Sequence, residues 1–568
     1  MIGRSVLKSV IQKSTHAQRL YRLYKRRFQN QYYPQWQKII DAEPTTWKEA
    51  KTQAKNGPRI LLATSAGGHP SSAIMDSFLA AALTLRGGHV SFLLCDSFLP
   101  ACQMVEIALM RPATMIRTGP QSYFCRGCYE RAGTIYDPLE LPILKYSEHV
   151  SAEELRETEH LVSTTPLDDI ESYVIDGVAV GEHAMAGALR YFARSTLEDL
   201  PHAEEVLKSY FKAALLTVYA VTHIIRTYRI DTVCVNHGIY VPHGLVAEVA
   251  RSINCRLVAW NVAYRKRSFI FSHGETYHHT LMTEPVSEWE GMHWSEKKEI
   301  EILDYLRSRR RGGRDWIVFQ AKNAQDDLTE IAKDIPGIDF SRPCIGMLTN
   351  VAWDAQLHYP ANAFPNMIDW VIKTIDYFRT RTDLQLIIRV HPAEISGDIK
   401  SNQPILNEIY HTFPNLPSNI FVIPPDQAIS TYAITEACNA VIIYGTKTGV
   451  ELTSLGIPVI VAGEAWIRNK GVTTDAESEE HYYQILDQLP HSSRMSEKTT
   501  TRARKYAYHF FFRRMIPVSQ MESTGREPQF RINCKTLSDL MPGRSKGLDV
   551  ICEGILTGSP FVYPSETY

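Results

Sequence analysis

Short apolar runs alternate with longer stretches of helical periodicity in the first half of the chain. The run at 59–63 is followed by a segment at 71–85 whose apolar residues recur at intervals of three and four. A second apolar run covers 89–94, and a long helical pattern at 204–229 leads to the run "TVCV". Strands separated by helices of this length predict a parallel sheet with helices on both faces.

The same alternation begins again in the second half. An apolar run near 342–354 precedes a helical stripe at 366–379, and further apolar runs follow at 384–390, 440–444 and 459–462. Between the two halves, "LRSRRRGGRDW" is basic and broken by glycines, so we expect it to be exposed and to precede a domain junction. The predicted fold class is α/β, with two Rossmann-like, doubly wound domains that face one another across a cleft.

These patterns divide the chain into four parts. The last part contains "RARKYAYHFFFRRMIP" and is less regular, and its aromatic residues suit a helix that packs back onto the body. The expected parts are a basic amphipathic segment at 1–45, an N-terminal domain at 46–335, a C-terminal domain at 336–490 and an extension at 491–568.

Charge is concentrated near the start of the chain, although the whole chain is almost neutral. The 568 residues carry a formal net charge of −1, which gives no argument for a nucleic-acid partner. Residues 1–40 are rich in lysine and arginine and contain no acidic residue. Their apolar residues lie near helical spacing, so the segment suits either an anionic membrane surface or a solvated helix that packs on the next domain.

Hydrophobic segments and cysteines favour a cytoplasmic location. No window reaches about 18 uncharged apolar residues, and the apolar core of a signal peptide is absent. The ten cysteines are therefore expected to be reduced thiols. Cys125 and Cys128 are closely spaced, but without a second such pair a closed zinc site is not predicted. A redox or partial metal role stays open beside a tight turn with buried thiols. We expect a cytoplasmic protein, peripheral at the inner face of the membrane if residues 1–40 bind lipid.

One loop in the second half has the composition of an anion site. The apolar run at 440–444 is followed by two glycines that enclose two threonines and a lysine, just before a helical segment. In a parallel sheet such a loop lies at the carboxyl edge, where a helix N-terminus offers N–H groups to a phosphate. The alternative is an ordinary turn with a capping threonine, and the Walker A pattern is absent. The loop residues are Gly445, Thr446, Lys447, Thr448 and Gly449.

Residues around this loop extend the pattern. Glu451 follows on the first predicted helical turn, where a carboxylate can accept hydrogen bonds from sugar hydroxyls. Arg389 ends another apolar run, and His391 follows it on a turn that Pro392 stiffens. An imidazole at this edge can bind a phosphate oxygen or protonate a leaving group, whereas Arg389 also suits a structural ion pair.

Histidines of the first half are further candidates. "TSAGGHP" places Gly67 and Gly68 before His69, which is a candidate base for a hydroxyl nucleophile or else a helix cap. His237 lies in a second loop, and His273 opens a cluster of three histidines and a glutamate. Because neither a carboxylate-rich constellation nor HExxH accompanies that cluster, we expect substrate contact or loop structure there and no metal.

Taken together, these motifs resemble the capsule polysaccharide biosynthesis glycosyltransferases, relatives of the bacterial Kdo transferases. "RVHP" is similar to the Arg-x-His-Pro turn of that family, and "GTKTGVELTSLGIPVIVAG" with "NKGVT" is similar to its later motifs. In the first half, "GVAVGEHAMAGALRYFAR" and "VNHGIYVPHGLVAEVA" resemble the acceptor side of the family. "SAGGH" is similar to the glycine loop of the peptidoglycan N-acetylglucosaminyltransferase. The resemblance spans about 59–475.

The resemblance implies a GT-B fold whose second domain holds a CMP-, UDP- or GDP-linked sugar without a metal or other cofactor. It assigns the hydroxyl-rich loop and His391 to the leaving phosphate, Glu451 to the ribose, and Lys470 with Arg389 to the donor. His69 would deprotonate the acceptor hydroxyl in an inverting reaction. The acidic catalytic residue of the family has no clear equivalent in the first half, which leaves the base and the donor open. The expected acceptor or cleft residues are Gly67, Gly68, His237 and His273.

The expected function is sugar transfer from this donor to a growing cell-surface polysaccharide or glycolipid. One alternative is a nucleotide-sugar 2-epimerase of the same fold. Another is a non-catalytic subunit of a complex that assembles or exports polysaccharide. The expected partners are the nucleotide sugar, a glycan or glycolipid acceptor and, through residues 1–40, an anionic membrane surface.

Overall fold

The computed structural model describes most of the chain and divides it into two compact units. The described residues are 30–310, 312–319, 323–355, 357, 359–525 and 527–565. Unit 1 comprises 30–191, Leu200–Glu275 and Ile516–Tyr563, and unit 2 comprises Phe192–Asp199, Thr276–Met515 and 564–565. The membrane-binding prediction for residues 1–40 falls largely outside the described residues.

The units differ from the predicted domain boundaries. The chain passes from unit 1 to unit 2 at Thr276, well before the predicted boundary at residue 336. The predicted C-terminal extension is also divided, because Ile516–Tyr563 returns to unit 1. There β13 (Ile516–Pro517) pairs antiparallel with β6 (Ser268–His273). Pairing between segments so far apart leaves no periodic mark in the sequence, so the pattern alone could not divide the chain correctly.

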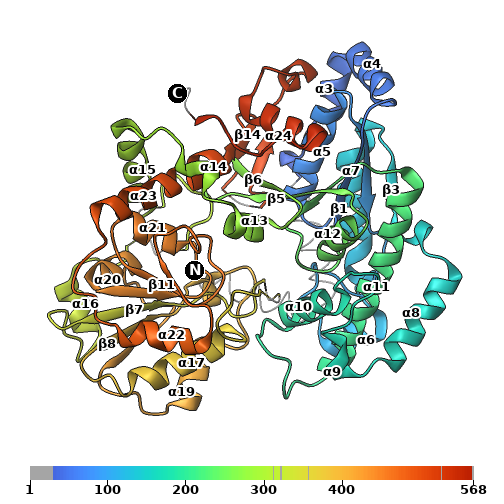
Figure 1. Cartoon of the computed structure of the whole chain (residues 1–568). Helices are drawn as coiled ribbons and strands as arrows, with labels where there is room; N and C mark the ends of the chain where they lie inside the picture. The colour runs from blue at the N-terminus through green and yellow to red at the C-terminus, as the bar shows by residue number, and fades with distance from the viewer. Residues whose placement is uncertain are drawn as a thin grey trace. The chain divides into compact units, whose positions relative to one another are not determined.

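Unit 1 is built on a seven-stranded sheet in the order β13-β6-β5-β4-β1-β2-β3 (Figure 1). β1 to β5 are parallel, and β6 and β13 extend the sheet with antiparallel pairings. The parallel strands are β1 (Arg59–Ser65), β2 (His89–Leu94), β3 (Ile143–Lys145), β4 (Thr232–Asn236) and β5 (Arg256–Val262).

Helices cover both faces of this sheet. α5 (Pro70–Thr84) connects β1 to β2, and α12 (His243–Ser252) connects β4 to β5 in the opposite direction along the sheet. Because such crossovers are right-handed, the two helices lie on opposite faces. α24 (Lys546–Thr557) packs on α5, and α11 (Ala203–Tyr228) packs on α12. The connections reverse direction between β1 and β4, which makes this the switch point where open α/β sheets bind ligands.

Unit 2 is built on a six-stranded parallel sheet in the order β12-β11-β10-β7-β8-β9. α17 (Met367–Phe378) leads from β7 to β8, and α21 (Thr448–Ser454) leads from β10 to β11 on the other side of β7. The switch point of unit 2 therefore lies between β7 and β10. The strands are β7 (Cys344–Leu348), β8 (Gln385–Arg389), β9 (Ile420–Ile423), β10 (Ala440–Ile443), β11 (Val459–Val461) and β12 (Thr474–Asp475).

The predicted helical stripe of the second half packs as expected. In α17, Val371 and Ile375 are buried against the strands of unit 2, and Ile368 and Ile372 pack at the margin of that core. The helix begins after Asn366, whose side chain accepts a hydrogen bond from the N–H of the third helical residue. Apolar side chains on one face explain both the helix and its position on the sheet.

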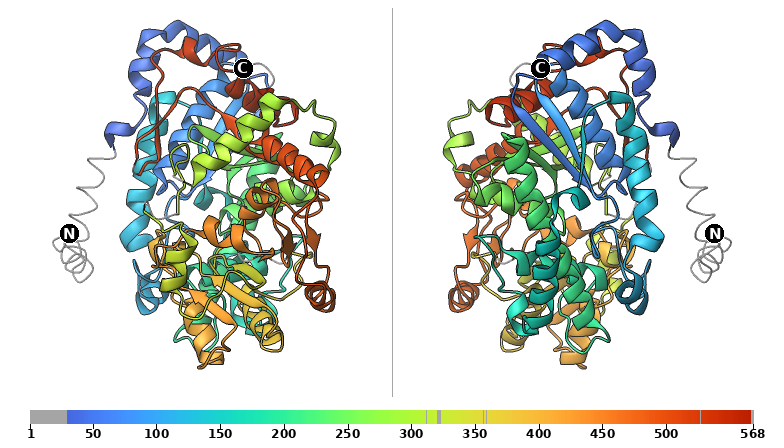
Figure 2. Two further views of the ribbon diagram at one scale, coloured as in Figure 1. Left: turned by 90° about the vertical axis from the view of Figure 1, so that its left-hand side faces the viewer. Right: turned by 90° about the vertical axis from the view of Figure 1, so that its right-hand side faces the viewer.

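The remaining elements surround these layers (Figure 2). In unit 1 a hairpin is formed by β14 (Met521–Ser523) and β15 (Phe530–Ile532). Further helices in the first part of the chain are α3 (Trp36–Ala42), α4 (Pro44–Ala54), α6 (Pro112–Thr118), α7 (Arg126–Tyr136), α8 (Ala152–Thr164), α9 (Leu167–Ile170) and α10 (Val180–Phe192). Those of unit 2 are α13 (Tyr277–Thr283), α14 (Ser287–Glu290), α15 (Glu296–Arg309), α16 (Leu328–Asp334), α18 (Ala393–Ser396), α19 (Ile405–Thr412), α20 (Thr431–Ala437), α22 (Glu479–Asp487) and α23 (Glu497–Tyr508).

The predicted α/β fold class is confirmed, because each unit has a mainly parallel sheet with the strand–helix alternation seen in the sequence. None of the helices within the described ranges is long and apolar enough to cross a membrane.

Candidate active site

The loops at the switch point of unit 2 come close to one another. Thr349 and Asn350 follow β7, and Gly445 follows β10 closely. A Cβ on Gly445 would lie 3.3 Å from the main-chain oxygen of Glu464 and 3.4 Å from Nδ2 of Asn350. The main-chain N–H of His391, in the loop after β8, donates to Thr349 Oγ1 at 3.1 Å. These bonds and approaches bring the loops after four strands together at one edge of the sheet.

The two threonines of the loop after β10, residues 445–449, shape its turn. Oγ1 of Thr446 accepts a hydrogen bond from the main-chain N–H of Thr448 at 3.3 Å and donates to Oγ1 of Thr448 at 3.2 Å. Gly449 is buried, and a Cβ there would lie 2.6 Å from Cδ1 of Ile443. Gly445 is exposed. The Thr446 hydroxyl thus closes the turn before α21, whose N-cap residue Lys447 makes no side-chain cap hydrogen bond, and Gly445 leaves the main chain accessible at the start of the loop.

Glu451 is buried and occupied by partners of its own chain. Nζ of Lys447 donates to Glu451 Oε1 at 2.5 Å, Nε of Arg309 lies 3.2 Å from the same oxygen, and the hydroxyl of Tyr432 donates to Oε2. Burial by itself raises the pKa of this carboxyl, but the two cations and the hydrogen bonds lower it to about 2. The prediction that Glu451 binds ribose is therefore corrected: it is the counter-ion of Arg309 and Lys447.

Arg309 joins a second carboxylate to this network. It is an ion-pair partner of Asp315, and it donates to the hydroxyl of Tyr305 at 2.9 Å. Tyr305 in turn donates to Asp315 Oδ1 at 2.8 Å. Arg309 and Asp315 are both buried, although their basic, glycine-broken segment was expected to be exposed. The segment is thus only partly exposed: Arg307, Gly313 and Arg314 are at the surface, whereas Arg309 is a buried cation whose role only the position of Glu451 in space reveals.

His391 is held as a neutral imidazole beside a cation. Its Nδ1 accepts a hydrogen bond from the main-chain N–H of Ala393 at 3.1 Å, so the proton of the neutral ring is on Nε2. Burial lowers the pKa of His391 to about 4, and the positive charges of Lys447 and Arg389 contribute. His391 can therefore donate a hydrogen bond from Nε2 at neutral pH. The loops that carry His391 and Lys447 lie at the same edge of the sheet, after β8 and β10.

Replacing His391 with alanine is expected to weaken the nucleotide binding that the sequence motifs predict by about 10- to 100-fold, since a hydrogen bond to a charged group contributes about 1.5–3 kcal/mol. Calorimetric titration with nucleoside mono- and diphosphates measures this. His411→Ala, an exposed histidine on α19, is the matched control. Equal affinity in the two variants would remove His391 from the binding site.

Two predicted donor residues have structural roles instead. Arg389 is buried and donates to the main-chain oxygens of Pro424 and Gln427, the latter at 3.1 Å, so it holds the loop after β9. Lys470 is fully buried, and its Nζ donates to the main-chain oxygens of Met282 at 3.0 Å and of Glu284 at 2.8 Å. Burial lowers the pKa of Lys470 to about 8. Their assignment to the donor is therefore corrected.

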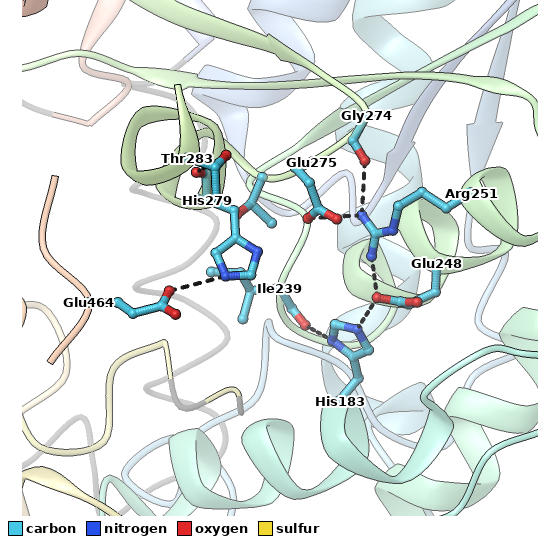
Figure 3. Close-up of polar contacts among 10 residues, drawn as sticks. His183, Ile239, Glu248, Arg251, Gly274, Glu275, His279, Thr283 and Glu464 are labelled. Carbon is cyan, nitrogen blue, oxygen red and sulfur yellow. Dashed lines mark hydrogen bonds and ion pairs between the residues drawn. The ribbon is translucent and has the colours of Figure 1, made fainter. Parts of the chain in front are cut away.

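A histidine–glutamate pair that the sequence did not single out for the donor lies at the same edge. Nε2 of His279, on α13, is 3.1 Å from Oε2 of Glu464 (Figure 3). Oε1 of Glu464 accepts a hydrogen bond from the main-chain N–H of Ala361 at 3.0 Å. Burial raises the pKa of Glu464, but His279 and that N–H outweigh it and lower the pKa. Because Glu464 also approaches Gly445, this pair belongs to the surroundings of the loop after β10.

The switch point of unit 1 is formed by a glycine loop packed on α7. Gly67 and Gly68 follow β1, and His69 precedes the first residue of α5. A Cβ on Gly67 would lie 2.6 Å from Cβ of Ala132 and 2.7 Å from the main-chain oxygen of Cys128. No side chain fits at this position. Oγ of Ser72, on the first turn of α5, donates a hydrogen bond to Oδ1 of Asn236, the last residue of β4, at 3.2 Å. This bond joins the segment after β1 to the end of β4.

Gly67→Ala is expected to lower the free energy of unfolding by about 1–3 kcal/mol, because the new methyl group meets atoms of α7 that cannot move aside. Gly127→Ala is the control, since a Cβ at Gly127 meets nothing within 4 Å. Thermal unfolding of the two variants measures the difference. Identical midpoints would show that α7 does not confine the glycine loop.

His69 projects from this loop among cationic side chains. It is exposed, and it caps no N–H of α5 with its side chain. Protein atoms around the loop partly desolvate the ring and lower the pKa of His69, and the positive charges of Arg190 and Arg131 lower it further. Arg131 also donates to the main-chain oxygen of Gly68. His69 is thus neutral at pH 7 and can accept a proton.

Two further histidines lie between the end of β4 and the first residue of α12. His237 has a positive φ of 65° and stacks on Tyr240 with 5.6 Å between ring centroids, and Arg190 lies 5.1 Å from the same tyrosine ring. His243 is buried, donates from Nε2 to the main-chain oxygen of Thr64 at 2.9 Å and accepts at Nδ1 from Gln103 at 2.9 Å. His237 therefore lines the switch point, whereas His243 ties the loops together.

A buried network fixes the loop after β4 from α10. Nδ1 of His183 bonds to the main-chain oxygen of Ile239, and Nε2 lies 3.4 Å from Glu248 (Figure 3). Glu248 in turn pairs with Arg251, which lies 3.5 Å from Glu275. His183 stands in the segment "GVAVGEHAM", which the family resemblance had marked without assigning a residue. Its role is to position main chain.

His273 lies at the other edge of the sheet. Because β6 is antiparallel to β5, His273 stands opposite Val258, near the start of β5. Its Nε2 donates to the main-chain oxygen of Ser559 at 2.9 Å, and its ring stacks on Phe561 with 4.3 Å between centroids. The expectation that His273 contacts substrate is corrected, since the reversed strand direction carries it away from the switch point.

Comparison with known proteins gives structural matches only. No family model and no curated protein matches the chain. Thermosulfurimonas dismutans KpsC, a beta Kdo 2,4 transferase, is 12% identical over 55% of this chain and 87% of that chain, with a TM-score of 0.34. A structure of S. aureus MnaA with UDP is 12% identical over 79% and 92% of the two chains, with a TM-score of 0.26. Neisseria meningitidis UDP-GlcNAc 2-epimerase bound to UDP-GlcNAc is 10% identical over 79% and 94%, with a TM-score of 0.23.

The matched structures thus include Kdo transferases of the kind that the sequence motifs resemble, together with 2-epimerases and other glycosyltransferases such as the spinosyn rhamnosyltransferase SpnG. At these identities and scores the comparison adds no assignment of residues. The roles of individual side chains rest on the contacts described above.

Proposed function

We propose that the chain is a glycosyltransferase of GT-B architecture that moves a sugar from a nucleotide-sugar donor to a cell-surface polysaccharide or glycolipid. The observation that carries this proposal is the pair of switch points, one in each unit, each with a glycine loop and a neutral histidine. Two such loops suit a reaction with two substrates, an activated sugar and a hydroxyl acceptor.

The donor is assigned to unit 2. Its phosphate lies at the exposed Gly445, where it accepts from Nε2 of His391. Lys447 has three N–H donors, so it can bind a phosphate oxygen while it remains paired with Glu451. These donors neutralise the charge that develops on the leaving phosphate, which is how such a reaction proceeds without a metal.

The acceptor is assigned to unit 1. His69 accepts the proton of the attacking hydroxyl as that oxygen bonds to the anomeric carbon, and the nucleotide leaves from the opposite face with inversion. Arg131 and Arg190 favour the neutral form of His69 before the reaction. His237 lines the same edge.

A panel of CMP-, UDP- and GDP-sugars tests the proposal through nucleotide release. Release that rises when a glycan acceptor is added supports transfer. Interconversion of the sugar without net release would indicate a 2-epimerase, and binding without turnover would indicate an assembly subunit. Either of the last two results overturns the proposal.

Attachment to the inner face of the membrane through residues 1–40 is a separate part of the proposal. It is supported by the basic, amphipathic sequence. Deletion of 1–40 is expected to reduce sedimentation of the protein with vesicles that contain anionic lipid, and to leave nucleotide release unchanged. Unaltered sedimentation would contradict it.

A further inference from the structure

The chain that precedes β7 passes along the carboxyl edge of the sheet of unit 2. Asp315 is paired with Arg309, whose Nε also reaches α21, the helix that follows β10. Farther along, the N–H of Gln325 donates to the main-chain oxygen of Ala428 at 2.7 Å, and Gln325 accepts from the N–H of Ser430 at 2.9 Å. These last two partners lie between β9 and α20. The chain is thus anchored beside the loop after β10 at one point and beside the loop after β9 at the other.

Phe319 contacts the candidate phosphate ligand His391 between these two anchors. The phenyl ring meets the imidazole edge to face, with 5.1 Å between the ring centroids and 68° between the ring planes. His391 follows β8, which is separated from β10 by β7 alone. Two strand spacings cover about 10 Å, and four residues can span up to about 14 Å, so residues 315–319 are long enough for this crossing.

The phenyl ring of Phe319 remains accessible although it contacts His391. Phe319 is 44% exposed, and it is the only exposed phenylalanine among the described residues. Val318, directly before it, is exposed as well. A single exposed apolar side chain is ordinary on a protein surface, but this pair stands beside a group that can donate a hydrogen bond to a phosphate. The place of the ring, more than its exposure, therefore indicates a ligand.

The part of the donor that suits this ring follows from its distance to the phosphate. In the proposed function the phosphate accepts from Nε2 of His391, and one ribose joins that phosphate to the base. The base therefore lies within the length of one nucleotide from His391. A phenyl ring has no hydrogen-bonding atom for a phosphate or a hydroxyl, but it offers a flat apolar face on which a base can stack.

This assignment also supplies what the candidates from the sequence lack. Glu451, the predicted ligand of the nucleoside, is occupied by its own counter-ions. His391, Lys447 and the main chain at Gly445 serve the phosphate alone. Phe319 provides an apolar surface for the rest of the nucleotide, and the sequence did not single it out because its neighbour in space follows another strand.

We propose that Phe319 is the surface on which the nucleobase of the donor stacks, beside the phosphate ligand His391. The inference rests on the proposed function, which assigns a nucleotide sugar to unit 2. The ion pair of Asp315 with Arg309 holds the chain before Phe319, so the ring is in place before the nucleotide binds and less conformational entropy is lost on binding. Because a phenyl face reads no hydrogen-bond pattern, Phe319 contributes affinity for any base and does not select among them.

Calorimetric titration of the full chain with CMP, UMP, GMP and ribose 5-phosphate tests this, with competition measurements for the weakest ligand. Phe319→Leu keeps an apolar side chain but removes the ring, and it is expected to weaken binding of the nucleotides by about 5- to 150-fold. Its affinity for ribose 5-phosphate, which has no base, should be unchanged. Phe319→Tyr keeps the aromatic face and should retain the affinity for nucleotides. Tyr410→Leu removes another exposed aromatic ring of unit 2, on α19, and is the matched control.

Several results would overturn the inference. Unchanged nucleotide affinity in Phe319→Leu is one, and equal losses for nucleotides and ribose 5-phosphate are another. A loss of equal size in Phe319→Tyr would also do so, as would a loss confined to nucleotide sugars, which would place the transferred sugar on the ring. Wild-type protein that binds no nucleotide would overturn the donor assignment and this inference together. Nucleotide binding with the expected losses but without sugar transfer would support the stacking role and overturn only the proposed function.

Discussion

Replacing His69 with alanine is expected to lower kcat/KM for sugar transfer by about 10²–10⁴-fold, the usual contribution of a general base. His69 is the exposed imidazole at the switch point of unit 1, and its neutral form accepts the proton of the acceptor hydroxyl. Since the side chain caps no helix N–H, its removal leaves the fold intact.

The pH dependence of kcat/KM provides a second reading of the same role. The pKa of His69 is lowered below the ordinary histidine value of about 6.5. The imidazole therefore stays unprotonated at neutral pH, and the fraction of active base falls only at a pH well below 6.5. Wild-type activity should therefore be level through neutral pH and decline on the acid side. His160→Ala, an exposed histidine on α8, is the control. Full activity of His69→Ala would assign the base to another residue.

Replacing Arg309 with methionine is expected to lower the free energy of unfolding by about 3–5 kcal/mol, as removal of one partner from a buried ion pair does. The methionine removes the cation from Asp315 and leaves Glu451 with Lys447 and the hydroxyl of Tyr432 as partners. Arg307→Met, at an exposed position of the same helix, should change stability by less than about 0.5 kcal/mol. Denaturant unfolding, followed by fluorescence, measures both variants.

The difference between wild type and Arg309→Met should shrink in acid. The folded pKa of Glu451 is lowered to about 2, below its value of about 4.3 in the unfolded chain. The carboxylate therefore contributes stability that is complete above the unfolded pKa and is lost as the pH falls through the folded pKa. A stability difference that stays constant from pH 7 down to pH 3 would show that Glu451 is not stabilised by Arg309.

The sequence was a good guide wherever the signal is local. Apolar periodicity located α17 and the strands on either side, because a helix or strand must bury one face and the side chains that do so recur at its own period. The glycine loops after β1 and β10 were also predicted at the carboxyl edge, since the alternation of strand and helix determines where such loops must lie.

Partners of charged side chains were beyond the sequence. Glu451, Lys470 and Arg389 all have the residue type of a phosphate or sugar ligand, yet each is occupied by groups far away in the chain. The role of His273 was predicted wrongly for a related reason. β6 runs antiparallel to β5, and the residues of the strand do not indicate its direction.

By itself, then, the amino-acid order determined which segments become strands and helices and which loops stand at the ends of the strands. Only the tertiary structure decided which ionisable groups are neutralised inside the protein and which remain available at the two switch points. The physical reason is that periodicity reflects contacts within one element, whereas the state of a charge depends on atoms that distant segments bring to it.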